Sequence, residues 1–513
     1  MDVFYYDLDF QIDPNDQSII GQSQIHFRAV ESIDRLQLDL YENLIIDSVL
    51  FSRGDSISIS RECNAFFFAL RADLEIGKDY IVSVYYHGKP IVAKNAPWDG
   101  GFTFSNDAEG NHWIGTSVQG MGASLFWACK DHLSDEPDSV TISVTIPEPL
   151  RYVGNGRFRG EESLEDGRNK FTWHVSYPIN LYNVSLNIAN YVEFGETYIS
   201  PLTGDSLDLE YFVLPENLSK AKSHFHQVVP MMECFEKKLG AFPFWEDGYK
   251  LVETPYLGME HQTAIAYGNQ YKTGYMGRDY SRIGLDFDYI IIHETGHEWW
   301  GNNVSCADVA DLWIHEGFCT YSEAIYVECL HGYETALKYI NAKKSSIGNK
   351  NPMMGVYHVH EEGSGDMYSK GMLFLNSVRH IINDDELWWS MLKEMQESEF
   401  RLKTISAQNV LDFFEDRTGM EMDKIFEQYL MNASIPKLEY RYLGKKKKDQ
   451  LFELRFVTDV EGFSMPVNVK ANEEDHTWIT VSNEWTLYSF KGKKAFQFSV
   501  NDDLTYITVE FVE

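Results

Sequence analysis

Hydrophobic residues alternate with polar residues along the first two fifths of the chain. Leu36, Leu38 and Leu40, for example, are each separated by one polar residue. This period of two is typical of strands that bury one face. Glycine, asparagine and aspartate residues, which favour turns, separate these segments. The pattern predicts an N-terminal antiparallel β-sheet domain over residues 1–213.

Beyond Pro215 the spacing of hydrophobic residues becomes helical. Apolar residues recur every three or four positions in six segments, which cover residues 221–239, 286–300, 312–330, 372–382, 407–418 and 423–430. Ser406 before one segment and Gly240 after another are residues that typically begin and end helices. The pattern predicts a mainly helical, thermolysin-like domain over residues 214–434.

After Pro436 the period of two returns, along residues 451–457, 478–481 and 506–512. It predicts a small C-terminal β-sandwich domain over residues 435–513. The expected fold class is therefore α+β and multidomain, with a β-rich domain on each side of a helical one. The length of 513 residues agrees with about three domains of roughly 150 residues each. No apolar run approaches the ~18 residues that a membrane-spanning helix needs.

The charge of the chain narrows the classes of function. There are 44 basic and 78 acidic residues, which gives a net charge of −34. An acidic excess of this size repels nucleic-acid phosphates and anionic membrane surfaces, so we expect neither as a partner. It favours solubility and cationic substrates. The sequence does not indicate the oligomeric state, nor whether the protein is cytoplasmic or exported after loss of a signal peptide.

The strongest chemical signal is the sequence His-Glu-Thr-Gly-His at residues 293–297. Two histidines four residues apart project from one face of a helix, where their rings can share one tetrahedral metal ion. Glu294 lies beside them, placed to take a proton from water. Such a string arises by chance roughly 0.03 times in a chain of this length. The alternative is therefore a helix with two ordinary histidines and a surface glutamate.

Glu316 is the candidate for a third metal ligand. A zinc enzyme that keeps one coordination position open uses three protein ligands, and two histidines with one glutamate form a known set. Glu316 follows His297 after 18 residues, a gap long enough to bring a second helix back antiparallel. Its neighbours are apolar, and a metal would remove the cost of burying its carboxylate. The alternative is a surface carboxylate.

Together these motifs resemble those of the zinc aminopeptidases typified by aminopeptidase N and leukotriene hydrolase, which are gluzincin metallopeptidases. Residues 257–261, Leu-Gly-Met-Glu-His, resemble the family's Gly-x-Met-Glu-Asn element, and residues 368–371, Tyr-Ser-Lys-Gly, resemble its Tyr-x-Lys-Gly element. Gln119 matches the Gln or Glu that precedes a Pro-Cys-x-Asp stretch in the family. The first strand is also similar, so the resemblance spans nearly the whole chain.

The resemblance implies a role for each matching residue. His293, His297 and Glu316 would hold one Zn²⁺ per chain. Glu294 would be the general base that activates water for attack on the scissile carbonyl, and Tyr368 would donate a hydrogen bond to the developing oxyanion.

The same resemblance implies a zinc aminopeptidase that acts on peptides with a free N-terminus. Glu260, together with Gln119, would hold the α-amine of the substrate, which fixes its first residue next to the metal. The backbone of Gly258 and Met259 would lie along the substrate as a strand edge. Two other functions remain open from the sequence: a zinc endopeptidase, and a catalytically silent relative that binds peptides.

Each of these matches also has an ordinary explanation when it is taken alone. Glu260 would then be a surface glutamate after a turn, Tyr368 a half-buried tyrosine, and Gln119 would carry no information. Glu323 lies two helical turns after Glu316 on the same face. It is either a surface carboxylate or a residue that orients a zinc-bound histidine. The order and spacing of the motifs favour the functional explanation.

The sequence departs from the family pattern at several positions. Leu257 replaces a glycine, His261 replaces an asparagine, and His315 replaces the asparagine that commonly precedes the third ligand. The stretch Ala-Cys-Lys-Asp at residues 128–131 lacks the family's proline. The sequence stops at Glu513 after the small β-domain, so we expect a short form that lacks the family's C-terminal helical domain and has a more open cleft.

Overall fold

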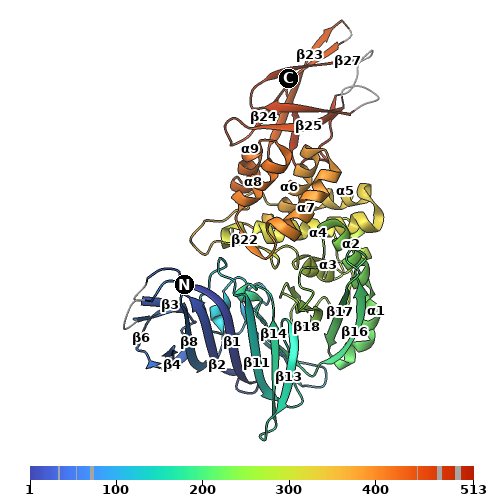
Figure 1. Ribbon diagram of the computed structural model, residues 1–513. Coiled ribbons are helices and arrows are strands. Elements are labelled where there is room, and N and C mark those ends of the chain that lie inside the picture. Colours follow the sequence, from blue (N-terminus) through green and yellow to red (C-terminus); the bar gives the residue numbers. More distant parts are fainter. Residues whose placement is uncertain (33–34, 53–54, 70–73, 448, 471–475, 492–497) are drawn as a thin grey trace. The chain divides into compact units, whose positions relative to one another are not determined.

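The computed structural model describes residues 1–513 except 33–34, 53–54, 70–73, 448, 471–475 and 492–497 (Figure 1). The described chain forms two compact units. The first contains Met1–Lys237, Ala241–Gly277 and Phe287–Asn303, and the second contains Lys238–Gly240, Arg278–Asp286 and Val304–Glu513. No helix among the described residues is long and apolar enough to cross a membrane.

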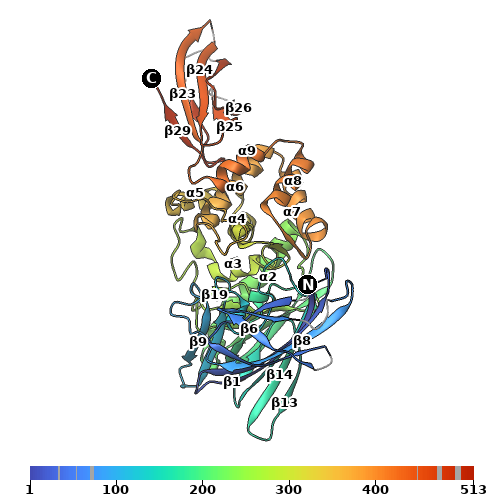
Figure 2. The same cartoon turned by 90° about the vertical axis from the view of Figure 1, so that its left-hand side faces the viewer.

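An eight-stranded sheet is the largest element of the first unit (Figure 2). Neighbouring strands within this sheet run antiparallel, except that β1 and β11 run parallel to each other. Alternate side chains of β1 and β2 are buried, as the period of two predicts. In spatial order the strands are β13 (Arg157–Ser163), β14 (Arg168–Val175), β11 (Ser139–Pro147), β1 (Asp2–Asp13), β2 (Ser18–Arg28), β8 (Asp79–Gly88), β4 (Leu44–Phe51) and β5 (Asp55–Ser56).

Two smaller sheets complete the N-terminal β-rich part. One contains β12 (Arg151–Val153), β15 (Asn187–Ala189), β10 (His112–Ser117) and β9 (Gly101–Asn106), and the other contains β3 (Arg35–Asp39), β7 (Ala65–Ala69) and β6 (Ile59–Glu62). Their buried faces share one hydrophobic core with the large sheet. The expected N-terminal β-domain is confirmed.

A mixed five-stranded sheet positions the predicted motif at residues 257–261 in the first unit. Its spatial order is β16 (Val192–Ile199), β17 (Ser206–Val213), β18 (Tyr249–Glu253), β20 (Ile265–Tyr267) and the edge strand β19 (Gly258–Met259). The helices α1 (Leu218–His224) and α3 (Tyr289–Gly296) belong to the same unit. A single helix over 221–239 is wrong: a 3-10 turn separates α1 from α2 (Val228–Leu239). Because α2 begins at Val228, Pro230 lies in its first turn, where backbone N–H groups have no partner within the helix and the missing N–H of proline costs nothing.

The second unit is mainly helical up to Met431. The predicted helices at 312–330 and 407–418 are confirmed, and Ser406 caps the latter. Two helices that the spacing did not predict, α5 and α7, lie among them. The helices are α4 (Trp313–His331), α5 (Tyr333–Ala342), α6 (Asp366–Ile382), α7 (Asp385–Glu394), α8 (Ala407–Thr418) and α9 (Asp423–Phe426), and a short parallel pair joins β21 (Val304–Cys306) to β22 (Lys403–Ile405).

Two small sheets form the C-terminal β-rich part of the second unit. One contains β27 (Thr486–Lys491), β24 (Asp449–Val457), β23 (Lys437–Lys446) and β29 (Thr508–Phe511), and the other contains β26 (His476–Ser482), β25 (Ser464–Lys470) and β28 (Ser499–Val500). Backbone atoms of Tyr506 bind Tyr429 and Ser377 of the helical part. The predicted fold class is therefore confirmed, whereas the boundaries 1–213, 214–434 and 435–513 stay a prediction.

The helices α4 and α6 cross at two glycines. A Cβ atom built on Gly371 would lie 2.7 Å from the Cα of Gly317, so neither helix has room for a side chain there. Glu316 precedes one glycine, and Tyr368 lies one turn before the other. Lys370 is buried and donates to the carbonyls of Asn432 and Ala433, 3.0 Å away. The motifs around Glu316 and Tyr368 thus also serve helix packing.

The loop between β18 and β20 is buried and carries His261. The side chain of His261 is fully buried, and neither ring nitrogen has a hydrogen-bond partner among the described residues. Burial disfavours the imidazolium and lowers the pKa of His261 to about 3. The folded protein therefore holds this residue as a neutral imidazole.

Replacing Gly371 with alanine should destabilise the second unit. Alanine in a helix is intrinsically better than glycine by about 1 kcal/mol, but the clash with Gly317 forces α4 and α6 apart. We expect a net loss of about 2 kcal/mol in the free energy of unfolding, measured by urea denaturation. Gly348→Ala is the control, because its Cβ would meet only ordinary contacts at 3.5 Å. Stabilisation by Gly371→Ala would contradict the tight crossing.

Replacing His261 with asparagine should make stability less sensitive to acid. Between pH 6.5 and 3 His261 is protonated in the unfolded chain but stays neutral in the folded protein. The free energy of unfolding therefore decreases as the pH falls through this range. Between pH 7 and 5 the wild type should lose about 2 kcal/mol more than His261→Asn. Urea denaturation at several pH values measures both slopes. His261→Gln should share the shallower slope, and equal slopes for all three proteins would refute the assignment.

Candidate active site

The helix α3 begins at a buried carboxylate. Asp288 accepts hydrogen bonds from the backbone nitrogens of Ile290, at 2.9 Å, and Ile291, at 3.4 Å, which caps the helix. The same carboxylate accepts from His224 at 2.7 Å and from Tyr267 at 2.8 Å. The cap therefore fixes the start of α3 to α1 and to the strand β20. The predicted helix over 286–300 is shorter than expected and ends at Gly296.

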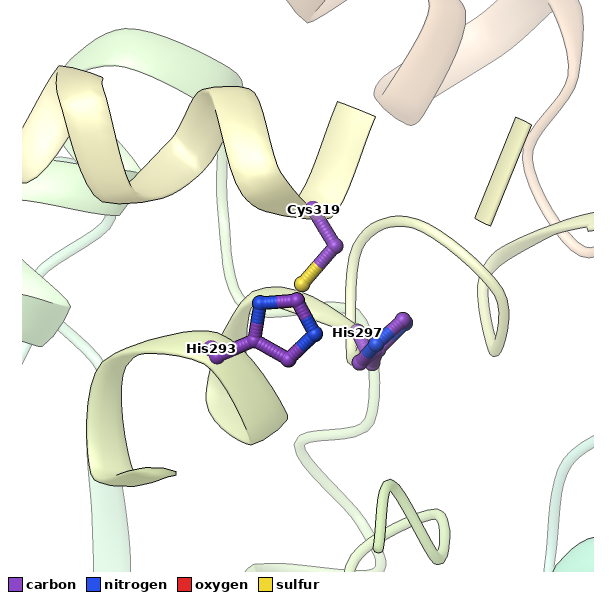
Figure 3. Close-up of side chains that lie close together, drawn as sticks. All are labelled: His293, His297 and Cys319. Atoms are coloured by element: carbon purple, nitrogen blue, oxygen red, sulfur yellow. The ribbon is translucent and has the colours of Figure 1, made fainter. Parts of the chain in front are cut away.

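His293 and His297 lie one turn apart at the end of α3, as the spacing predicts. Their ring centroids are 5.0 Å apart (Figure 3). The Nδ1 atom of His297 lies 2.9 Å from the carbonyl oxygen of Trp300, which can only accept, so this nitrogen carries the proton of the neutral ring. The Nε2 atom then presents its lone pair. The ring of His293 stacks on Tyr289, with centroids 5.1 Å apart.

Glu294 faces the edge strand β19. A Cβ atom built on Gly258 would lie 2.9 Å from Oε1 of Glu294 and 2.8 Å from Ile290, so this position accepts only glycine. The backbone of Gly258 and Met259 therefore lies directly against the helix that carries Glu294. Glu294 itself is 8 % exposed, which leaves it accessible to a small molecule but largely desolvated.

Two side chains hold the carboxylate of Glu260. Gln119, which follows β10, donates to Oε1 at 2.6 Å, and Tyr182 donates to the same oxygen at 3.1 Å. Gln119 and Glu260 are thus brought together, as the resemblance implies. Tyr182 is a residue of this candidate site that the motifs in the sequence did not indicate. It lies in a 3-10 turn (Leu181–Asn183) with no motif around it.

Buried asparagines support the backbone around Glu260. Asn302 donates to the carbonyl of Glu260 at 3.0 Å, and Asn183 donates to the side chain of Asn302 at 2.6 Å. Asn155 donates to the carbonyl of Gln262 at 2.7 Å. These bonds connect the N-terminal β-rich part to both the β19 loop and the turn after α3. No local pattern marked these residues in the sequence.

Two acidic side chains and one histidine of the first unit lie close together. Ligand atoms of Glu260, Glu294 and His297 all lie within 4.8 Å of one another, and all three side chains are buried. Two carboxylates this close together repel each other unless a cation lies between or beside them. The arrangement therefore favours a metal ion, a cationic ligand such as an amine, or both.

The donor types of the predicted ligands His293, His297 and Glu316 fit zinc. Imidazole nitrogens and carboxylate oxygens are the usual ligands of this ion. His297 has its Nδ1 bound to a carbonyl, the arrangement that orients a metal-binding Nε2.

The remaining candidates lie in the second unit. Glu316 is buried in the first turn of α4, and Tyr368 on α6 is 36 % exposed. His315 accepts a hydrogen bond from the backbone nitrogen of Cys306 at 2.8 Å, which ties α4 to β21. Glu323 is not a surface residue: it is fully buried, accepts from Tyr339 at 2.5 Å and pairs with Lys343 at 3.7 Å.

Several known proteins are similar to this chain. Aminopeptidase B of Rattus norvegicus is 24% identical over 266 residues, 48% of this chain and 38% of its own. Probable aminopeptidase 1 of Saccharolobus solfataricus is 19% identical over 96% of this chain and 61% of its own. The chain thus spans about two fifths of the length of the first curated relatives it matches.

Solved structures show the same fold. An M1 zinc metallopeptidase mutant from Deinococcus radiodurans, bound to a Tyr-Ser-Ala substrate, has a TM-score of 0.70 and 19% identity, and the match covers 85% of this chain and 95% of that one. The non-mutant enzyme gives a TM-score of 0.69 with the same identity and coverage. At this identity the likeness establishes the fold alone.

Two family models match the sequence itself. The peptidase family M1 domain matches residues 224–429, and the peptidase M1 N-terminal domain matches residues 3–182. The first range contains α3, the β19 loop and the second-unit candidates, and the second contains Gln119 and Tyr182. Together they cover about three quarters of the sequence, in the order that the family requires. The chain belongs to peptidase family M1.

Proposed function

We propose that this chain is a zinc-dependent aminopeptidase, which hydrolyses the N-terminal bond of peptides with a free α-amine. The observation that carries the proposal is the convergence of Glu260, Glu294 and His297 within 4.8 Å. In this proposal Glu260 would bind the amine, Glu294 would transfer the proton and His297 would bind the metal, and their closeness supports these roles. Membership of family M1 and relatives named aminopeptidases support it.

His293, His297 and Glu316 would hold the zinc ion. When bound, the metal would supply Lewis acidity, which polarises a peptide carbonyl and makes attack by water feasible at neutral pH. His293 lies in the last turn of α3, His297 directly follows that helix, and Glu316 lies in the first turn of α4. A glutamate near a helix N-terminus is stabilised by the helix dipole, which suits a carboxylate that must stay ionised.

Glu294 would accept the proton of the attacking water and return it to the leaving amine. Its carboxylate is buried beside the edge strand β19, where the scissile bond would lie. Tyr368 would donate a hydrogen bond to the oxyanion that forms on the carbonyl. General acid–base catalysis of this kind contributes about 10²- to 10⁴-fold in rate.

Glu260 would bind the α-amine of the substrate, and Gln119 would hold that carboxylate in position. Tyr182 would serve the same positioning role, because it donates to the same oxygen as Gln119. The carboxylate of Glu260 would then face the amine. The backbone of Gly258 and Met259, at the edge of the sheet, would pair with the substrate as an added strand.

Replacing Glu294 with glutamine should remove turnover without removing the metal. We expect the rate of hydrolysis of aminoacyl chromogenic amides to fall about 10²- to 10⁴-fold, with zinc content by mass spectrometry unchanged. Glu233→Gln, at an exposed position of α2, is the matched control and should keep the wild-type rate. A wild-type protein without zinc, or an unchanged rate in Glu294→Gln, would favour a silent peptide-binding relative.

Acetylating the α-amine of a substrate should abolish most cleavage. The charge-assisted contact with Glu260 is lost, which should lower kcat/KM by about 30- to 10³-fold in the wild type. In Glu260→Gln the unblocked peptide should already be cleaved slowly, so acetylation should change its rate less than about tenfold. Matched peptides with and without the acetyl group measure both ratios. Equal cleavage of both peptides by the wild type would identify an endopeptidase instead.

A further inference from the structure

A pocket of about 700 Å³ opens in the first unit beside the five-stranded sheet. It lies where the parallel strands β18 and β20 end, an edge at which ligands often bind in such sheets. Its walls are mainly apolar, and two of its aromatic side chains are exposed, Trp98 at 63 % and Tyr275 at 42 %. The residues used below are Trp98, Lys220, Leu257, Tyr271, Tyr275 and Met276.

The pocket adjoins the candidate active site through two of its lining residues. Leu257 directly precedes Gly258, whose Cα lies against Glu294. The ring of Tyr275 packs edge-on against Tyr289, with centroids 5.4 Å apart, and Tyr289 stacks on His293. A ligand that leaves the candidate site along β19 toward Leu257 would therefore enter this pocket.

The loop that forms one wall is held in a strained conformation. Gln270, Tyr271 and Met276 line the pocket with φ angles of 57°, 58° and 52°, which non-glycine residues rarely adopt. Asn269 holds the loop: it accepts from the nitrogen of Met276 and donates to Asp288. Strain that is maintained in this way is typical of ligand-binding walls, so the pocket is preformed.

The charges around the pocket disfavour a cationic ligand. The carboxylate of Glu253 already accepts from the backbone of Leu214 at 2.8 Å and from Asn217 at 2.7 Å. Lys220, whose ammonium donates to Asn217 at 3.0 Å, is the one basic residue among the described lining residues. A basic side chain of the substrate would meet this ammonium, whereas the Glu253 carboxylate is buried and already accepts from two donors.

We propose that this pocket binds an apolar side chain of the substrate, from the second or third residue of the peptide. The proposal rests on the proposed function. With the amine at Glu260 and the cleaved bond opposite Gly258, an extended peptide continues past Leu257, because both backbones advance about 3.3 Å per residue. The enzyme should therefore select leucine or phenylalanine at that position and reject lysine.

The test compares kcat/KM for tripeptides Ala-X-Ala and Ala-Ala-X, with X as glycine, leucine, phenylalanine or lysine. At one of the two positions the wild type should prefer leucine or phenylalanine over glycine by about 10- to 100-fold, and should cleave the lysine peptide most slowly. Trp98→Ala should reduce the preference to less than about threefold. It should not change hydrolysis of alaninamide, which has no second residue.

Two controls separate the pocket from general effects of the substitutions. Phe158→Ala removes another exposed aromatic ring of the first unit, outside the pocket, and should keep the preference. Lys220→Gln should raise the rate on the lysine peptide about three- to tenfold, whereas Lys222→Gln on the same helix α1 should not.

Three outcomes are distinguishable. The pocket proposal would be overturned if the wild type hydrolysed alaninamide but cleaved all tripeptides with the same kcat/KM whatever the residue X. It would also be overturned if Trp98→Ala kept the wild-type preference. Either result would leave the proposed function intact. Failure to hydrolyse alaninamide and all peptides would overturn the proposed function. If Trp98→Ala does not fold, calorimetric binding of the same peptides to Glu294→Gln decides: the order leucine or phenylalanine, glycine, lysine supports the pocket, and equal affinities refute it.

Discussion

The carboxylate of Asp288 is the interaction on which the geometry of the first unit depends. It caps α3, receives hydrogen bonds from α1 and β20 through His224 and Tyr267, and receives another from Asn269 in the pocket loop. A fully buried charge without such partners would be very costly. With them, and with the positive end of the helix dipole, one residue fixes the helix that carries His293 and Glu294 to the wall of the adjoining pocket.

A second constraint is the closeness of Glu260 and Glu294. Folding brings the two carboxylates and the imidazole of His297 together in a buried region. Without a cation, the repulsion between the buried carboxylates lowers the free energy of unfolding. The supporting bonds are correspondingly numerous. Gln119 and Tyr182 bind the side chain of Glu260, and Asn302 binds its backbone. The N-terminal β-rich part thus does more than pack: it supplies the donors that hold one acidic residue in place.

The sequence predicted features that depend on residues close together along the chain. It did not predict features that depend on residues far apart along the chain. The spacing of His293 and His297 is a property of one helical turn, and Ser406 caps the helix that directly follows it, so local pattern was sufficient for both. Tyr182 contacts Glu260 across 78 residues of sequence, and Gly317 meets Gly371 across a helix crossing. Such pairs exist only after the chain has folded, and no single-segment pattern contains them. The uninterrupted helix over 221–239 failed for a local reason, the position of Pro230.

Two of the departures from the family pattern, Leu257 and His261, lie on either side of Glu260. Leu257 lines the apolar pocket, whereas His261 is buried on the other side as a neutral ring without partners among the described residues. Neither contributes a hydrogen bond to the carboxylate of Glu260, which is held by Gln119 and Tyr182 instead. The surroundings of the strand can therefore differ from the family pattern without moving the carboxylate of Glu260. Because the pocket loop and α3 share Asp288, a ligand that shifted the loop would also disturb the helix cap, so the pocket must select ligands that fit its existing shape.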